Sequence, residues 1–147
     1  MLRLLIVGYG NPLRSDDGLG WHVARQLSRE ISRDDVQTIA VHQLMPEIAE
    51  SASRAEQVLF IDAAQQGIPG SLSCTQLSPA PAANLQTHKF SPAMILKLAK
   101  DLYGRCPPAQ LFTVTGESFE TGESMSPAVV AAIPGLIEQI RNYFGGE

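Results

Sequence analysis

The sequence lacks the features of several protein classes. It has no cluster of basic residues, and its net charge is −4 with a pI near 5.3. Because binding to nucleic acid requires a basic face, we expect no nucleic-acid partner. No apolar run approaches the roughly 20 residues that span a bilayer. The opening residues also lack a signal-peptide cleavage site, so we expect a cytoplasmic protein without membrane contact.

Cysteine is scarce, and the common nucleophile motifs are missing. The two cysteines, Cys74 and Cys106, form no CxxC pair and have no metal-finger spacing, so we expect both to be reduced. No GxSxG turn, HExxH helix or Walker lysine occurs. No obvious base is placed beside Cys106, which favours an ordinary thiol there over a nucleophile. The sequence thus predicts neither a serine nor a cysteine hydrolase.

The chain of 147 residues has the length of one domain, and apolar runs alternate with amphipathic segments. This alternation predicts a single three-layer α/β/α domain over 1–147, with a mainly parallel five-stranded sheet. The alternation does not determine the strand order, but if the order begins 2-1-3, the loops after the first and third strands flank one crevice. The fourth strand has the weak alternation of an edge strand. Strands are expected at 2–10, 36–44, 57–64, 70–77 and 110–116, and helices at 17–31, 46–55, 91–103 and 126–144.

The first strand leads into a glycine-rich loop, GNPLRSDDGLG, which resembles a dinucleotide-binding turn only in part. The third glycine of GxGxxG is replaced by Leu13, and two adjacent carboxylates, Asp16 and Asp17, would repel a pyrophosphate. These features argue against nucleotide binding. A helix cap is the common use of such aspartates, and Ser15 or Asp16 is a plausible N-cap for the helix that follows.

Three residues with metal-binding side chains lie where the predicted strands end. Asp17 follows the first strand, Asp62 lies at the end of the third, and His88 lies in the loop after the fourth. Ligands of open α/β sheets bind at this edge, so the three side chains are candidates for one site. Two carboxylates and an imidazole suit Zn²⁺ or Ni²⁺ and leave a coordination position open.

Each of the three candidates also has a plain structural interpretation. For Asp17 the structural role is an interaction with the helix dipole, for Asp62 a hydrogen bond to its own loop, and for His88 simple solvation. His22 and His42 are alternative imidazoles, and we rank them below His88 with structural or supporting roles. Only convergence in the fold distinguishes these alternatives.

Several segments together resemble the hydrogenase maturation proteases, which trim the C-terminus of the large subunit of [NiFe] hydrogenases. GYGNPLRSDDGLGWHV is similar to the opening signature of that family, FIDAA to its central aspartate strand, and THKFSPAMILKLAKDLYG to its histidine loop. HQLMPEIAE and GESFETGESMSPAV also match, without a catalytic role that we can assign. The resemblance covers nearly the whole chain. Some relatives carry Glu where this chain has Asp17.

The resemblance implies an endopeptidase that removes a C-terminal peptide from a nickel-loaded large-subunit precursor. It assigns both the catalytic and the metal-binding roles to Asp17, Asp62 and His88, which would recognise Ni²⁺ carried by the substrate. Zn²⁺ or Cd²⁺ would substitute for nickel in crystals. The alternative is a non-catalytic chaperone that recognises nickel in the large subunit without cutting it. From its size we expect a monomer.

Overall fold

The computed structural model describes residues 2–81 and 90–144. Strands β1 and β2 are separated by a 3-10 turn and helix α1, and short helix α2 leads into β3. The chain closes with a 3-10 turn at Asn142–Phe144. The strands are Leu2–Tyr9 (β1), Val36–Val41 (β2), Ala55–Ala64 (β3), Leu72–Gln76 (β4) and Ala109–Thr115 (β5), and the helices are Leu19–Glu30 (α1), Ile48–Ser53 (α2), Pro92–Tyr103 (α3) and Pro127–Arg141 (α4).

The described strands form a five-stranded sheet in the order β2-β1-β3-β5-β4. All neighbouring pairs are parallel except β4 with β5, which is antiparallel. The order begins 2-1-3, which is the condition under which the loops after β1 and β3 flank one crevice, and the edge position predicted for the fourth strand is confirmed. Because β1 and β3 lie in the centre, their carboxyl ends meet at the edge where ligands bind in such sheets.

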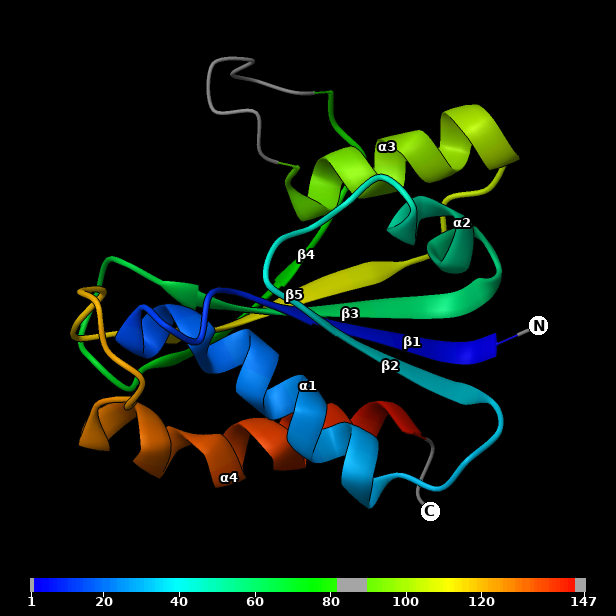
Figure 1. Cartoon of the computed structure of the whole chain (residues 1–147). Coiled ribbons are helices and arrows are strands. Elements are labelled where there is room, and N and C mark those ends of the chain that lie inside the picture. The colour runs from blue at the N-terminus through cyan, green and yellow to red at the C-terminus, as the bar shows by residue number, and fades with distance from the viewer. Residues whose placement is uncertain (1, 82–89, 145–147) are drawn as a thin grey trace.

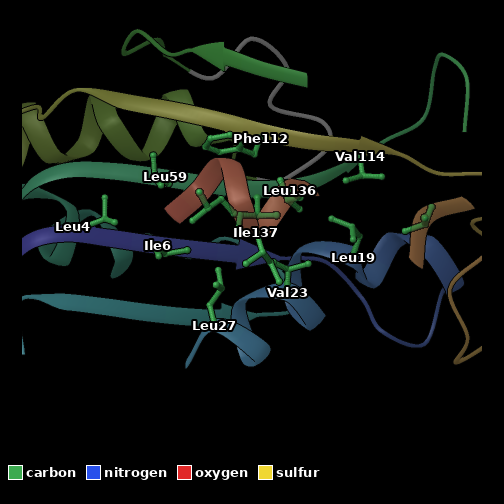
Figure 2. Packing of buried hydrophobic residues seen from close by; sticks show 13 residues of the cluster. Leu4, Ile6, Leu19, Val23, Leu27, Leu59, Phe112, Val114, Leu136 and Ile137 are labelled. Atoms are coloured by element: carbon green, nitrogen blue, oxygen red, sulfur yellow. The ribbon is translucent and has the colours of Figure 1, made fainter. Parts of the chain in front are cut away.

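Helices cover both faces of the sheet and give the predicted three layers (Figure 1). One core packs α1 and α4 against the sheet, with Leu19, Val23 and Leu136 among its fully buried residues (Figure 2). The other core packs α2 and α3 against the opposite face, around Phe60 and Ile95. Burial of these apolar side chains on both faces is the main source of stability. No helix in the two described ranges is long and apolar enough to cross a membrane.

Helix α3 lies in the predicted range and has the expected residue types at both of its ends. The Ser91 hydroxyl accepts a hydrogen bond from the amide of Met94, Pro92 occupies the first helical position, and Gly104 ends the helix with a left-handed φ of 77°. These are the N-cap, first-turn proline and C-terminal glycine expected from their conformational preferences.

The first helix differs from the prediction over 17–31. A 3-10 turn at Ser15–Gly18 comes first, and α1 begins only at Leu19, with Gly18 as an N-cap that contributes no side chain. Neither Ser15 nor Asp16 caps α1, so that prediction is wrong. Their side chains instead bond the segment after β5, which lies about 100 residues further along the chain.

Strand ends account for the other differences. β2 stops at Val41 rather than at residue 44, and α4 ends at Arg141 before the closing 3-10 turn. β3 begins at Ala55, two residues earlier than predicted, and ends at Ala64 as predicted, with Ala63 and Ala64 still paired with β5. Asp62 therefore lies in a paired strand, two residues before the end of that strand, rather than in a loop.

Candidate functional site

The loop that follows β1 is shaped by close approaches of main chain to main chain. A side chain at Gly20 would place its Cβ 2.2 Å from the carbonyl oxygen of Ile61, on the neighbouring strand β3. Gly10 adopts a φ of 145°, and a Cβ there would lie 1.9 Å from the carbonyl oxygen of Asp17. Only glycine fits either position. The glycines thus bring the turn that carries Asp17 down against β3.

Asp17 lies in the 3-10 turn and is half-buried. Its Oδ2 accepts a hydrogen bond from the amide of Asn11 at 2.8 Å. The Asn11 Oδ1 in turn accepts from the amide of Leu13 at 2.9 Å. This pair of bonds closes the loop on itself and restricts the orientation of the Asp17 carboxylate.

Asp62 lies on β3 opposite Thr113 of β5, near the carboxyl edge. Its Oδ1 accepts a hydrogen bond from the amide of Ala63 at 2.7 Å. A second partner is Tyr9, the last residue of β1, whose phenol donates a hydrogen bond to the Asp62 carboxylate. Burial, and then the charge of Asp62, raise the pKa of Tyr9 well above its ordinary value, so the phenol keeps its proton and remains a donor.

The structure brings two of the three predicted ligands to one edge of the sheet. The turn carrying Asp17 packs against β3, the strand of Asp62, and Tyr9 at the end of β1 donates a hydrogen bond to Asp62. His88, the predicted third ligand, lies outside the described residues. Within 2–81 and 90–144 no group of three His, Cys, Asp or Glu side chains is arranged to hold a metal ion. The three-ligand site therefore stays a prediction.

The alternative imidazoles, His22 and His42, both lie against Trp21 near the start of α1. Their rings meet the indole edge-on, with centroid separations of 5.0 Å for His22 and 5.9 Å for His42. Burial and the nearby charge of Arg25 lower the pKa of His22, so its imidazole is neutral at physiological pH. Aromatic packing is the role that the structure gives to both rings.

Asp16 is fully buried and is the centre of a hydrogen-bond network that sequence analysis missed. Its Oδ2 accepts from the amides of Glu117 and Ser118 at 2.7 and 3.0 Å and from the Ser126 hydroxyl at 2.7 Å. Its Oδ1 accepts from the Ser126 amide at 2.7 Å. Burial alone would raise the pKa of Asp16, but these four bonds outweigh it and lower the pKa.

The network joins the loop after β1 to the segment 116–126 after β5. The Ser15 amide donates to the carbonyl of Gly122 at 2.8 Å, and the Ser15 hydroxyl donates to the carbonyl of Glu120 at 2.8 Å. These bonds hold Ser15 at its left-handed φ of 54°, which is costly for a residue other than glycine. The segment GESFETGESMSP thus has a structural role, bracing the turn that carries Asp17.

Within the described ranges, the other acidic residues of the matching segments and the two cysteines have no metal-binding or nucleophilic role that the structure supports. Glu47 lies at the exposed start of α2, and Glu117 contributes its amide rather than its carboxylate. Both cysteines are free, as predicted. Burial raises the pKa of the Cys106 thiol despite the nearby charges of Lys100 and Arg105, so the residue is not activated as a nucleophile.

Comparison with known proteins gives one consistent result. No protein-family model and no curated protein sequence matches the chain. Solved structures do match it along nearly their whole length. A hydrogenase 2 maturation peptidase from a Thaumarchaeota archaeon has a TM-score of 0.75 at 25% identity, covering 99% of both chains.

Two further structures agree. The hydrogenase maturating endopeptidase HybD from E. coli has a TM-score of 0.74 at 25% identity, covering 95% of this chain and 90% of its own. The [NiFe] hydrogenase maturation protease HycI from Thermococcus kodakarensis has a TM-score of 0.76 at 24% identity, covering 96% and 91%. In its fold, the chain is therefore similar to solved structures of hydrogenase maturation proteases.

Proposed function

We propose that this protein is an endopeptidase that removes a C-terminal peptide from the nickel-loaded precursor of a [NiFe] hydrogenase large subunit. The observation that carries the proposal is the match over 95–99% of the chain to structures named as hydrogenase maturation endopeptidases. The carboxylates of Asp17 and Asp62 at one edge of the sheet add independent support.

The donor set suits nickel that is carried by the substrate. Two carboxylates and the imidazole of His88 would provide oxygen and nitrogen ligands, while the precursor supplies its own ligands to the same ion. A coordination shell with ligands from both the protein and the substrate would favour binding of the nickel-loaded precursor over the nickel-free precursor. It would also fix the scissile peptide at a defined distance from the two carboxylates.

The residues on this edge have distinct roles in the proposed reaction. Tyr9, by donating to Asp62, limits the rotation of that carboxylate. A carboxylate held in this way is suited to accept a proton from a water that attacks the peptide bond. The Asn11 amide orients Asp17 in the same manner. No serine or cysteine nucleophile is required.

The proposal is tested with a purified nickel-loaded precursor and mass spectrometry. We expect incubation with the wild-type protein to remove a C-terminal peptide, and Asp17→Asn, Asp62→Asn and His88→Ala to abolish this loss. Thermal unfolding of each variant shows whether the fold is intact. An unchanged precursor mass with the wild-type protein would favour the nickel-recognising chaperone, and trimming by all three variants would refute the site.

A further inference from the structure

A groove between α1 and the edge strand β2 is lined by basic residues, although the net charge of the protein is −4. Its cavity volume is about 310 Å³, and five residues line it. Two are arginines and two carry hydroxyls, and no acidic side chain among the described residues lines it. The lining residues are Arg25, Ser28, Arg29, Thr38 and Ala40.

The two arginines are available for a ligand. Within the described residues, neither Arg25 nor Arg29 makes an ion pair or a side-chain hydrogen bond, and both are exposed. The Arg25 guanidinium lies 4.7 Å from the centre of the Trp21 ring, which restricts its orientation. The acidic neighbour on α1, Glu30, is already bonded to Arg141 and Gln26. The groove therefore carries two uncompensated positive charges.

The strand beside the groove has an open edge. β2 is at the end of the sheet order and pairs only with β1 among the described strands (Figure 1). Thr38 and Ala40 pair with Ile6 and Gly8 of β1, and Ile6 belongs to the core beneath α1. Since alternate residues of a strand share a face, Thr38 and Ala40 both point to the α1 side. Their small side chains leave the room that forms the groove.

We infer that this groove binds an extended acidic segment of a partner protein, which adds as a strand to the free edge of β2. Main-chain hydrogen bonds to an open edge give such segments affinity, and side-chain pockets select them. Here the pocket selects by charge, because carboxylates of the segment would meet the guanidinium groups of Arg25 and Arg29. The inference goes beyond the proposed cleavage and does not require it.

The spacing of the arginines specifies the sequence of the segment. Four residues along a helix correspond to about 6 Å, and two residues along a strand correspond to about 6.6 Å. Acidic side chains at positions i and i+2 of an added strand would therefore both reach the α1 face, one near each arginine. Acidic side chains at i and i+1 would point to opposite faces, so only one would reach the groove.

The test uses three fluorescein-labelled peptides and fluorescence anisotropy with the full chain. The first is Thr-Val-Thr-Glu-Thr-Glu-Thr-Val, the second has the same composition with adjacent glutamates, Thr-Val-Thr-Glu-Glu-Thr-Thr-Val, and the third replaces both glutamates by glutamine. We expect the first to bind at least about tenfold more tightly than the other two, with an affinity that falls as salt is added. Equal binding of all three, or no binding of the first, would overturn the inference.

Two further measurements separate strand addition from general charge attraction. Arg25→Glu with Arg29→Glu should abolish binding of the first peptide, whereas Lys100→Glu on α3, an exposed cation in the opposite layer, should not. In hydrogen exchange, the bound peptide should slow exchange of amides in β2 and leave α3 unchanged. Binding that survives the double variant, or that leaves β2 unprotected, would contradict strand addition at this edge.

Discussion

Asp16 and Ser126 are 110 residues apart in the chain, yet two hydrogen bonds of 2.7 Å join them, one from the Ser126 amide and one from its hydroxyl. Ser126 is the residue directly before α4. The bonds therefore tie the start of the last helix to the turn that carries Asp17. The Ser126 hydroxyl donates to Asp16, and Ser126 makes no side-chain capping bond to the described residues of α4.

Replacement of Asp16 by Asn should destabilise the protein strongly. The asparagine would turn its NH₂ group toward at least one of the buried donors that now bond the Asp16 carboxylate, and that donor would lose its acceptor. We expect the free energy of unfolding to fall by about 3 kcal/mol. Asp17→Asn is the matched control, because Asp17 is half-buried and accepts a hydrogen bond from the amide of Asn11. Its loss should be about 1 kcal/mol or less. Urea denaturation of both variants measures the difference, and equal losses would contradict the role of Asp16.

The stability that Asp16 confers should depend on pH. Its pKa in the folded protein lies below the ordinary value of 3.8, so the unfolded chain binds the proton more readily. The contribution is therefore complete above the unfolded pKa and is lost as pH falls through the folded pKa. We expect the stability difference between wild type and Asp16→Asn to be constant from pH 7 to 5 and to shrink below pH 4. A difference that grows on acidification would refute this.

Removal of the Tyr9 hydroxyl should impair processing more than folding. Tyr9→Phe deletes the donor to Asp62 but keeps the ring, and loss of a group that orients a metal-binding carboxylate typically costs 10–100-fold in affinity or activity. We expect precursor trimming to slow by about tenfold or more, with unfolding changed by about 1 kcal/mol. Tyr103→Phe, on the exposed end of α3, is the control and should trim normally.

The glycine at position 20 should not tolerate a methyl group. In Gly20→Ala the new Cβ would lie 2.2 Å from the Ile61 carbonyl oxygen, so β3 and α1 would have to separate. We expect a loss of about 2 kcal/mol or more. Gly135→Ala in α4 makes only an ordinary contact, at 3.5 Å from Leu72, and should stabilise the helix by up to about 1 kcal/mol. Thermal unfolding of the pair checks both signs.

The sequence predicted the elements that depend on local signals. Strand β1 is a continuous apolar run, α3 has a cap at each end, and the alternation of strands and helices indicated a mainly parallel sheet. These features are fixed by neighbouring residues and by the handedness of parallel connections. They needed no knowledge of distant contacts.

The features that the sequence did not predict depend on contacts between distant segments. Asp16 was assigned to a helix cap because nothing near it in the chain points to Glu117, Ser118 or Ser126. Tyr9 gave no signal either, since its partner is on the neighbouring strand. The adjacent placement of the Asp17 turn and Asp62 follows from strand order, but the role of His88 remains a prediction.

The most direct test of the account is a crystal structure of the protein soaked with Cd²⁺ or Zn²⁺, with the ion located by anomalous scattering. The account predicts one ion at the carboxyl edge of β1 and β3, bound by carboxylate oxygens of Asp17 and Asp62 and by the imidazole of His88. For Zn²⁺ these bonds should be about 2.0–2.2 Å long. An ion bound elsewhere, or three side chains too far apart to share one ion, would contradict it.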